Sequence, residues 1–322
     1  MIMKTILVTG GCGFIGSNFI LNQFQKYGEI RIINIDKLTY AGVENNLQEL
    51  NNKKLSRFID YKFIKGDICD QELLSRIFNE KIDVVVNFAA ESHVDRSITD
   101  PTPFMTTNVI GTQRLLDSCK NANVPLYIQI STDEVYGSLG AEGEFTETSQ
   151  ISPNSPYSAS KAAADMLVMS YFKTYGFPAI ITRCSNNYGP RQYPEKLIPL
   201  MISKAINDQK LPVYGNGENV RDWIHVNDHC AGIDAVINNG KIGEVYNFGG
   251  KHEIQNIQLV KKLLEILDKP ESLIEYVEDR LGHDHRYAVS IDKSVEQLNW
   301  VPEVNFEDGI SETVKWYVEN DK

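Results

Sequence analysis

Two adjacent carboxyl groups, Asp133 and Glu134, follow an apolar segment near the middle of the chain. The segment spans residues 125–130 and is typical of a strand, and Thr132 directly precedes the acids. Adjacent carboxyl groups can act separately as acid and base when their surroundings separate their pKa values. The alternative is a pair of solvated acids at a strand end, and the residues that follow favour catalysis.

A second acid–base pair, Tyr157 and Lys161, lies a short distance downstream. Pro156 suits the first turn of a helix, and residues four apart share one helix face. A phenol beside an ammonium group has its anion stabilised and becomes a usable base near neutral pH. Two acid–base pairs at one site suggest chemistry in more than one step.

Glycines near the N-terminus predict a nucleotide site. A strand at 6–8 is followed by Gly10, Gly13 and Gly16, and then by a helical pattern at 17–27. Glycines at this spacing permit a tight turn and bring backbone N–H groups at a helix N-terminus to a pyrophosphate. A loop that merely contains glycines is the alternative, and the flanking strand and helix argue against it.

Asp36 ends the next predicted strand, 31–35, twenty positions after Gly16. A carboxylate at this place accepts a hydrogen bond from the adenine ribose 2′-hydroxyl and repels a 2′-phosphate. The residue therefore predicts NAD rather than NADP, although the cationic Lys37 follows directly.

The order of elements predicts an α/β fold with a Rossmann-like, doubly wound parallel sheet. Strands expected at 61–64, 83–88, 125–132 and 179–184 alternate with a long helix that begins at Pro101 and a helix from Pro156 to about Tyr175. His93, after the fourth strand, could be catalytic or only structural.

Two domains are expected: a Rossmann domain at 1–185, to which elements near 221–250 return, and a smaller C-terminal substrate-binding domain at 186–322. The C-terminal part should contain a helix after 194–199, a hairpin-like turn at 213–217, strands at 220–226 and 245–248, a helix at 226–236 and a closing helix at 306–319. Its basic residues could hold diphosphate oxygens or form surface ion pairs, and they are Lys196, Arg221, Arg280 and Arg286.

Composition excludes several classes of protein. The 322 residues carry a net charge of −11 with no basic block, which argues against nucleic acid or an acidic membrane as partner. The five cysteines are widely spaced without a CxxC pair, and His283 and His285 lack a third ligand, so we expect no disulfide and no metal site. The chain has no signal-peptide pattern and no long apolar run, and we expect a cytoplasmic protein.

Eight segments together resemble the dTDP-glucose 4,6-dehydratases of the extended short-chain dehydrogenase/reductase family. They are GGCGFIGS, DKLTYAG, AAESHVDRSI, STDEVYG, SPYSASKAAAD, NNYGPRQYPEKLIP, NVRDWIHVNDH and DRLGHDHRYA. The adjacent acids after Thr132 are the specific feature, since the related sugar epimerases have a similar layout without them. Leu281 stands where the family usually has proline, and His285 where it usually has arginine.

The resemblance implies an intramolecular redox cycle on a nucleotide-activated glucose, with tightly bound NAD as the cofactor. Tyr157 would take the proton of the C4 hydroxyl, Lys161 would lower the pKa of Tyr157, and Thr132 would orient the C4 oxygen. Glu134 would then remove the C5 proton while Asp133 protonates the departing C6 hydroxyl. Hydride taken from C4 would return to C6 and leave a 4-keto-6-deoxy sugar.

The resemblance also implies binding residues and a homodimer formed through the helices near 101–122 and 156–175. The cofactor would contact Gly10, Gly13, Phe14, Ile15, Gly16, Asp36, Lys37, Leu38, Thr39, Asp67, Ile68, Phe88, Ala89, Ala90, Ser92, Thr107, Tyr157, Lys161 and Asn187. The nucleotide sugar would contact Ser92, Thr132, Asn186, Lys196, Leu197, Pro212, Val213, Tyr214, Arg221, Asn256, Asp279, Arg280 and His283.

Three alternatives stay open at this point. The chain could be a 4,6-dehydratase of a CDP-, UDP- or GDP-linked sugar, a 4-epimerase, or a non-catalytic NAD-binding protein of the same fold. The adjacent acids speak against an epimerase, and the presence of both acid–base pairs speaks against a binding protein. The residues alone do not identify the nucleotide base or the deoxysugar pathway.

Overall fold

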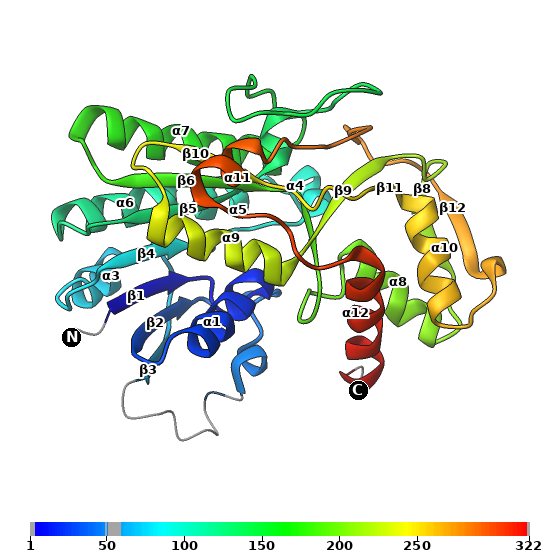
Figure 1. Ribbon diagram of the computed structural model, residues 1–322, viewed down its shortest axis with the longest axis horizontal. Helices are drawn as coiled ribbons and strands as arrows, with labels where there is room; N and C mark the ends of the chain where they lie inside the picture. The colour runs from blue at the N-terminus through cyan, green and yellow to red at the C-terminus, as the bar shows by residue number, and fades with distance from the viewer. Residues whose placement is uncertain (1–3, 49, 51–58, 321–322) are drawn as a thin grey trace.

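Seven strands form one parallel sheet in the order β10-β6-β5-β4-β1-β2-β3 (Figure 1). The computed structural model describes residues 4–48, 50 and 59–320, so the expected domain limits at residues 1 and 322 lie outside it. The strands of the sheet are β1 (Lys4–Thr9), β2 (Ile30–Asp36), β3 (Ile59–Lys65), β4 (Val84–Asn87), β5 (Tyr127–Thr132), β6 (Ala179–Cys184) and β10 (Val245–Phe248). The predicted doubly wound sheet is confirmed, and β10 returns from the C-terminal half to pair with β6 as expected.

Helices cover both faces of the sheet because its strands are apolar on both sides. Ile6 and Val8 of β1 face one hydrophobic cluster, and Leu7 between them faces the other, which is the alternation of a strand. The first layer contains α1 (Phe14–Lys26), α9 (Val226–Asn239) and α11 (Asp292–Leu298). The second contains α3 (Gln71–Ile77), α6 (Thr112–Asn121) and α7 (Pro156–Tyr175).

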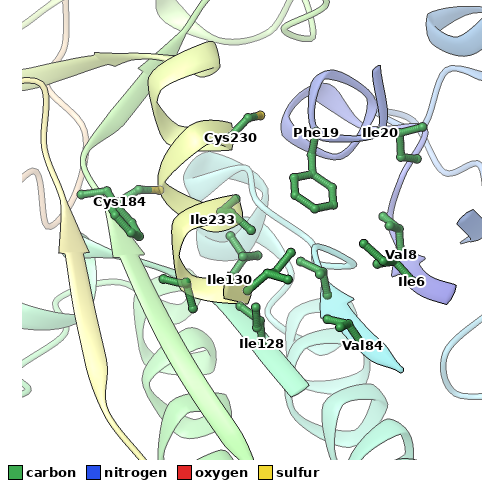
Figure 2. Packing of buried hydrophobic residues seen from close by; sticks show 14 of the residues in the cluster. Ile6, Val8, Phe19, Ile20, Val84, Ile128, Ile130, Cys184, Cys230 and Ile233 are labelled. Carbon is green, nitrogen blue, oxygen red and sulfur yellow. The ribbon is translucent and has the colours of Figure 1, made fainter. Parts of the chain in front are cut away.

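The α1–α9 side of this core is shown close up in Figure 2. Phe19 of α1 and Cys230 and Ile233 of α9 gather above Val8 and Ile130 of the sheet. Helix α9 therefore belongs with the N-terminal sheet although its residues come from the C-terminal half of the chain.

The helix predicted from Pro101 onward runs without a break from Thr102 to Asn121, but its middle part is π-helical. It consists of α5 (Thr102–Phe104), a π-helical segment η2 (Met105–Gly111) and then α6. A Cβ on Gly111 would come within 2.7 Å of the end of the Ile68 side chain, so this segment packs closely on the loop after β3. Before it lies α4 (Val94–Thr99), a short helix that the sequence pattern did not indicate.

As far as the structure describes it, the C-terminal lobe contains two small sheets and three helices that pack on them. Strand β9 (Val220–His225) lies between β7 (Asn186–Tyr188) and β11 (Glu253–Gln255), and β8 (Leu211–Tyr214) pairs with β12 (Ile274–Val277). The turn predicted at 213–217 is present, with the N–H of Gly217 donating to the carbonyl of Tyr214, but it does not close a hairpin. Strands β8 and β9 join different sheets, because β8 pairs with β12 and β9 with β7.

The helices of this lobe are α8 (Leu197–Ile206), α10 (Asn256–Ile266) and α12 (Phe306–Asn320), which pack around one hydrophobic cluster. They lie to the right of the large sheet in Figure 1. Single helical turns complete the description: η1 (Glu44–Leu47), η3 (Asp133–Tyr136) and η4 (Glu271–Leu273). Within the described residues no helix is both long and apolar enough to cross a bilayer.

Candidate active site

One cavity of about 290 Å³ opens at the carboxyl ends of the parallel strands. Gly10 follows β1, Asp67 lies just beyond β3, Ala89 lies just beyond β4, and Asp133 and Ser185 directly follow β5 and β6; all five line the cavity. Strand order reverses between β1 and β4, the place where open α/β sheets bind ligands.

The glycine-rich turn after β1 has the form of a dinucleotide cradle. Gly10 has φ of 70°, and a Cβ there would lie 2.7 Å from the backbone nitrogen of Ala89. A Cβ on Gly16 would lie 2.4 Å from the carbonyl oxygen of Gly10. Gly13 begins α1 with no side-chain cap, which leaves the first N–H groups of the helix available to an anion. These residues fit a pyrophosphate.

Asp36 is held in place by backbone groups. Its Oδ2 accepts from the N–H of Cys12 at 2.9 Å, and its Oδ1 accepts from the N–H of Leu38 at 2.8 Å. Burial raises the pKa of Asp36, and both backbone bonds oppose that rise. Each oxygen keeps a free lone pair, so the carboxylate can still accept from a ribose hydroxyl. Lys37, which could attract a 2′-phosphate, is paired with Asp67 at 2.8 Å.

The adjacent acids lie in η3, a single turn that begins where β5 ends. Thr132 caps the turn: its Oγ1 accepts from the N–H of Glu134 at 3.2 Å and donates to Asp133 Oδ1 at 3.2 Å. Asp133 is only 2 % exposed, and its Oδ2 has no hydrogen-bond partner among the described residues. Glu134 is half-buried and lines the same cavity.

The surroundings of the two acids differ in charge. Burial raises the pKa of Asp133 well above its ordinary value, and the neighbouring carboxylates of Glu134 and Asp222 raise it further. Burial also raises the pKa of Glu134, and three cations oppose part of this rise, namely Lys196, Arg221 and Arg280. Asp133 is therefore the group that keeps its proton, and Glu134 the one whose anion is supported.

Tyr157 and Lys161 come from the first turns of α7. Ser155 and Ser158 form a capping box there with Pro156 at the first position, so the local sequence starts the helix at this residue. The Lys161 ammonium donates to the carbonyl of Ile130 at 2.6 Å.

The surroundings of the Tyr157 phenol oppose its ionisation. Burial, and after it the charge of Glu134, raises the pKa of Tyr157 well above its ordinary value. The phenol is shielded from water, and the role of Lys161 in lowering the pKa of Tyr157 stays a prediction. The hydrogen bond with Thr132 acts in the opposite direction and lowers the pKa of Tyr157.

All five predicted catalytic residues line the cavity together with every predicted cofactor residue except Leu38. Leu38, at φ of 55°, instead anchors Asp36 through its backbone. Of the residues predicted for the nucleotide sugar, four line the cavity, and they are Ser92, Thr132, Asn186 and Lys196. Lys196 also donates to the carbonyl of Ser92 at 2.6 Å, which joins α8 to the loop after β4.

The other predicted substrate residues lie on the C-terminal lobe outside this cavity: Leu197, Pro212, Val213, Tyr214, Arg221, Asn256, Asp279, Arg280 and His283. Arg280 lies over the ring of Tyr214 at 5.1 Å and pairs with Asp95 of α4 at 2.6 Å, so this cluster meets the sheet domain. Val213 is buried in the core of the lobe, which leaves only its backbone for a ligand.

Two further expectations concern residues at the C-terminal edge of the site. The fork of Arg286 is occupied by Glu253, with bonds of 2.5 and 2.7 Å, so Arg286 is an ion-pair partner. His283 Nδ1 lies 2.7 Å from Asp279 Oδ1. In the described part of the chain, no three side chains of the metal-binding types converge on one point.

The comparisons with known proteins agree over nearly the whole chain. The family model described as GDP-mannose 4,6 dehydratase matches residues 7–313. The chain belongs to this family. The dTDP-glucose 4,6-dehydratase of Xanthomonas campestris pv. campestris is 50% identical over 337 residues, which cover 99% of this chain and 94% of that protein.

Solved dehydratase structures share the fold of this family member. The dTDP-glucose 4,6-dehydratase of Streptomyces venezuelae, with NAD and TYD bound, has a TM-score of 0.93 and 45% identity, and the match covers 98% of this chain and 97% of that one. The enzyme of Bacillus anthracis in complex with NAD has a TM-score of 0.91 and 50% identity, over 99% and 97% of the two chains. The family model names a GDP-linked sugar and these relatives a dTDP-linked one, so membership alone leaves the nucleotide open.

Twelve of the residues that line the cavity are not among those predicted from the sequence. They are Ile35, Ala41, Gly42, Gly66, Glu91, Ile130, Ser131, Cys184, Ser185, Gln192, Tyr193 and Glu195. The residues at the ends of β2, β5 and β6 could have been predicted, because the carboxyl ends of all strands in a parallel sheet lie at the same edge. The 192–195 loop carries none, since its position depends on how the C-terminal lobe docks.

Proposed function

We propose that this chain is a dTDP-glucose 4,6-dehydratase, which converts dTDP-glucose to dTDP-4-keto-6-deoxyglucose and water with tightly bound NAD. The observation that carries the proposal is the acid pair of η3, whose members lie in one cavity with the glycine cradle. Burial raises the pKa of both acids, but more cations oppose the rise at Glu134 than at Asp133. The curated relatives with this activity support dTDP-glucose as the substrate.

The first step is removal of the C4 hydroxyl proton by Tyr157, with Thr132 and Lys161 around the reacting oxygen. The glycine cradle and Asp36 would hold NAD, which would accept the hydride from C4 and later return it to C6. The Lys161 ammonium, buried and bound to Ile130, cannot turn away to solvent, so its charge stays at the site. That charge would stabilise the phenolate of Tyr157 as it forms.

Elimination follows, because the new C4 ketone acidifies the C5 proton. Glu134 is the base, since Lys196, Arg221 and Arg280 favour its anion. Asp133 is the acid that protonates the C6 hydroxyl as it leaves, since burial keeps its carboxyl group neutral. A 4-epimerase would have no use for a second, neutral carboxyl group at this place, and this favours the dehydratase.

Four cationic or hydrogen-bonding groups are suited to the nucleotide. Lys196 is half-buried and Arg221 is buried, and both charges act on Glu134. Arg280 and Tyr214 form the stacked pair of the C-terminal lobe. Arginine forks fit the non-bridging oxygens of a diphosphate. The residues near Leu281 and His285 would then face the base side.

The test is turnover of nucleotide sugars by the purified chain. We expect dTDP-glucose to give the alkali-induced absorbance of a 4-keto-6-deoxy sugar, and UDP-, CDP- and GDP-sugars to give much less. A strong signal with another nucleotide would change the substrate and keep the mechanism. Bound NAD without any turnover would refute the dehydratase and favour a non-catalytic NAD-binding protein.

Three further features belong to the same proposal. Residues 1–185 would form the NAD-binding domain and residues 186–322 the nucleotide-sugar domain, with α9 and β10 returning to the first domain. The chain would be a protein of the cytoplasm, and its five free cysteines suit that compartment. The chain would be a homodimer through η2 and α7, where Met105, Ile110, Met166 and Tyr175 are exposed. Met166→Lys should dissociate the dimer in size-exclusion chromatography, whereas Val301→Lys, at another exposed apolar position, should not.

A further inference from the structure

The side chain of Asn187 is hydrogen-bonded to His229, a residue to which the mechanism above gives no role. Asn187 lies on β7, lines the cavity and is 9 % exposed. His229 lies in the first turns of α9 and is completely buried at 0 %. The Nδ1 of His229 is 2.9 Å from the Oδ1 of Asn187.

The hydrogen bonds determine the orientation of both side chains. Asn187 Nδ2 donates to the carbonyl of Ser185 at 2.9 Å, and a carbonyl can only accept, so the amide nitrogen lies on that side. Oδ1 therefore faces His229, and because Oδ1 can only accept, the proton of the imidazole must be on Nδ1. Burial lowers the pKa of His229 to about 3, which keeps the ring neutral in this one tautomer.

Packing by itself does not account for a histidine at this position. The ring lies 6.0 Å from that of Phe248, next to the cluster in Figure 2 that contains Cys230 and Cys184. Nε2 is buried and has no partner among the described residues. An apolar side chain would fill the same space without leaving a nitrogen unpaired, so the bond to Asn187 is what distinguishes histidine here.

The second Nδ2 hydrogen of Asn187 has beside it the thiol of Cys184, which is only a weak acceptor. Ser185 takes one of the two hydrogens, and the other lies on the side of Cys184, whose thiol pKa Asn187 helps to lower. Cys184 itself lines the cavity. Rotation of the amide by half a turn would replace this donor with the acceptor Oδ1.

We infer that His229 is a positioning residue: it locks the Asn187 amide so that an N–H donor, and not an oxygen, faces an acceptor atom of the bound dinucleotide. This inference rests on the proposed function, because the dinucleotide is the NAD of the dehydratase.

The experiment is a double-mutant cycle on the full-length holoenzyme, with the rate of NAD dissociation as the readout. His229→Leu should increase the rate of NAD dissociation about tenfold, which is the change expected for the loss of one hydrogen bond. His229→Asn should stay within about twofold of wild type, since its Nδ2 is as many bonds from Cα as histidine Nδ1. In an Asn187→Ala background, adding His229→Leu should change the rate less than about twofold, because the group it positions is gone.

A purely structural role predicts different results. Val236→Ala, a buried change on the same helix, should lower the melting temperature without selective NAD loss. Equal NAD loss in His229→Leu and His229→Asn, or the same effect of His229→Leu with and without Asn187, would overturn the inference. So would a nitrogen NMR spectrum with the His229 proton on Nε2. If wild type holds NAD but turns over no nucleotide sugar, the proposed function fails, and the cycle still decides the role of His229.

Discussion

Replacing Glu134 by glutamine should separate oxidation at C4 from elimination at C5 and C6. The substitution keeps the shape of the side chain but removes the group that takes the C5 proton. Tyr157, Thr132 and Lys161 are untouched, so the first step should still occur. The variant should therefore stop after oxidation.

The size of the effect follows from the surroundings of the two acids. Loss of a positioned general base costs about 10²–10⁴ in rate, or about 3–5.5 kcal/mol in activation free energy. Asp133 is the neighbouring group that could substitute, but burial and Asp222 raise its pKa and keep it protonated. We therefore expect the upper part of that range for the loss of kcat.

Two signals from one reaction mixture test this prediction. With enzyme in excess over dTDP-glucose, the near-ultraviolet absorbance of reduced nicotinamide should rise and persist in Glu134→Gln, while the alkali-induced absorbance of the product stays low. Glu91→Gln is the matched control, because Glu91 is another partly buried carboxyl group that lines the cavity and whose pKa burial raises. The control should keep its turnover within about threefold of wild type, as expected for a side chain outside the chemistry.

The reasoning would be refuted by normal product formation in Glu134→Gln. Absence of both signals, with NAD still bound, would also contradict it, because it would place Glu134 in the oxidation step. Equal losses in Glu91→Gln and Glu134→Gln would mean that any charge removed from the cavity has the same effect.

Three other changes have expected outcomes. Because the pKa of Asp133 is raised in the folded chain, the free energy of unfolding should fall as pH rises from the unfolded pKa of about 3.9 toward the folded one. In thermal unfolding, Asp133→Asn should lose less stability over this pH range than wild type. The same variant should lose most of its activity. Asp165→Asn should lower the free energy of unfolding by about 3–5 kcal/mol in a denaturant titration. The reason is that Arg183, which is 5 % exposed and bound to Asp165 at 2.9 Å, is left without its anion. The control Asp208→Asn, in an exposed ion pair, should cost less than about 1 kcal/mol. Asp36→Asn should weaken NAD binding about tenfold or more and improve NADP binding in calorimetry, since a charged acceptor is lost and a repulsive charge is removed.

The elements of the large sheet could be predicted because their signals are local. A strand such as β1 or β6 is an apolar run of the right length, and α7 has its own start signal in Ser155, Pro156 and Ser158. Parallel strands place their carboxyl ends at one edge, so Asp36 and Asp133 could be expected in one cavity before any coordinates. Residue type and spacing were sufficient for this part of the site.

Tertiary structure decided the features that depend on distant partners. Strand β8 pairs with β12 and not with its neighbour β9, and the ion pair of Arg280 with Asp95 joins residues 185 positions apart. The charge of Glu134 is supported by Lys196, Arg221 and Arg280 only because the C-terminal lobe folds back over η3. Hydrophobic periodicity reports which face of an element is buried, but not which element covers it. For this reason the sequence identified the acids and the bases, and the packing of the two lobes determined which acid keeps its proton.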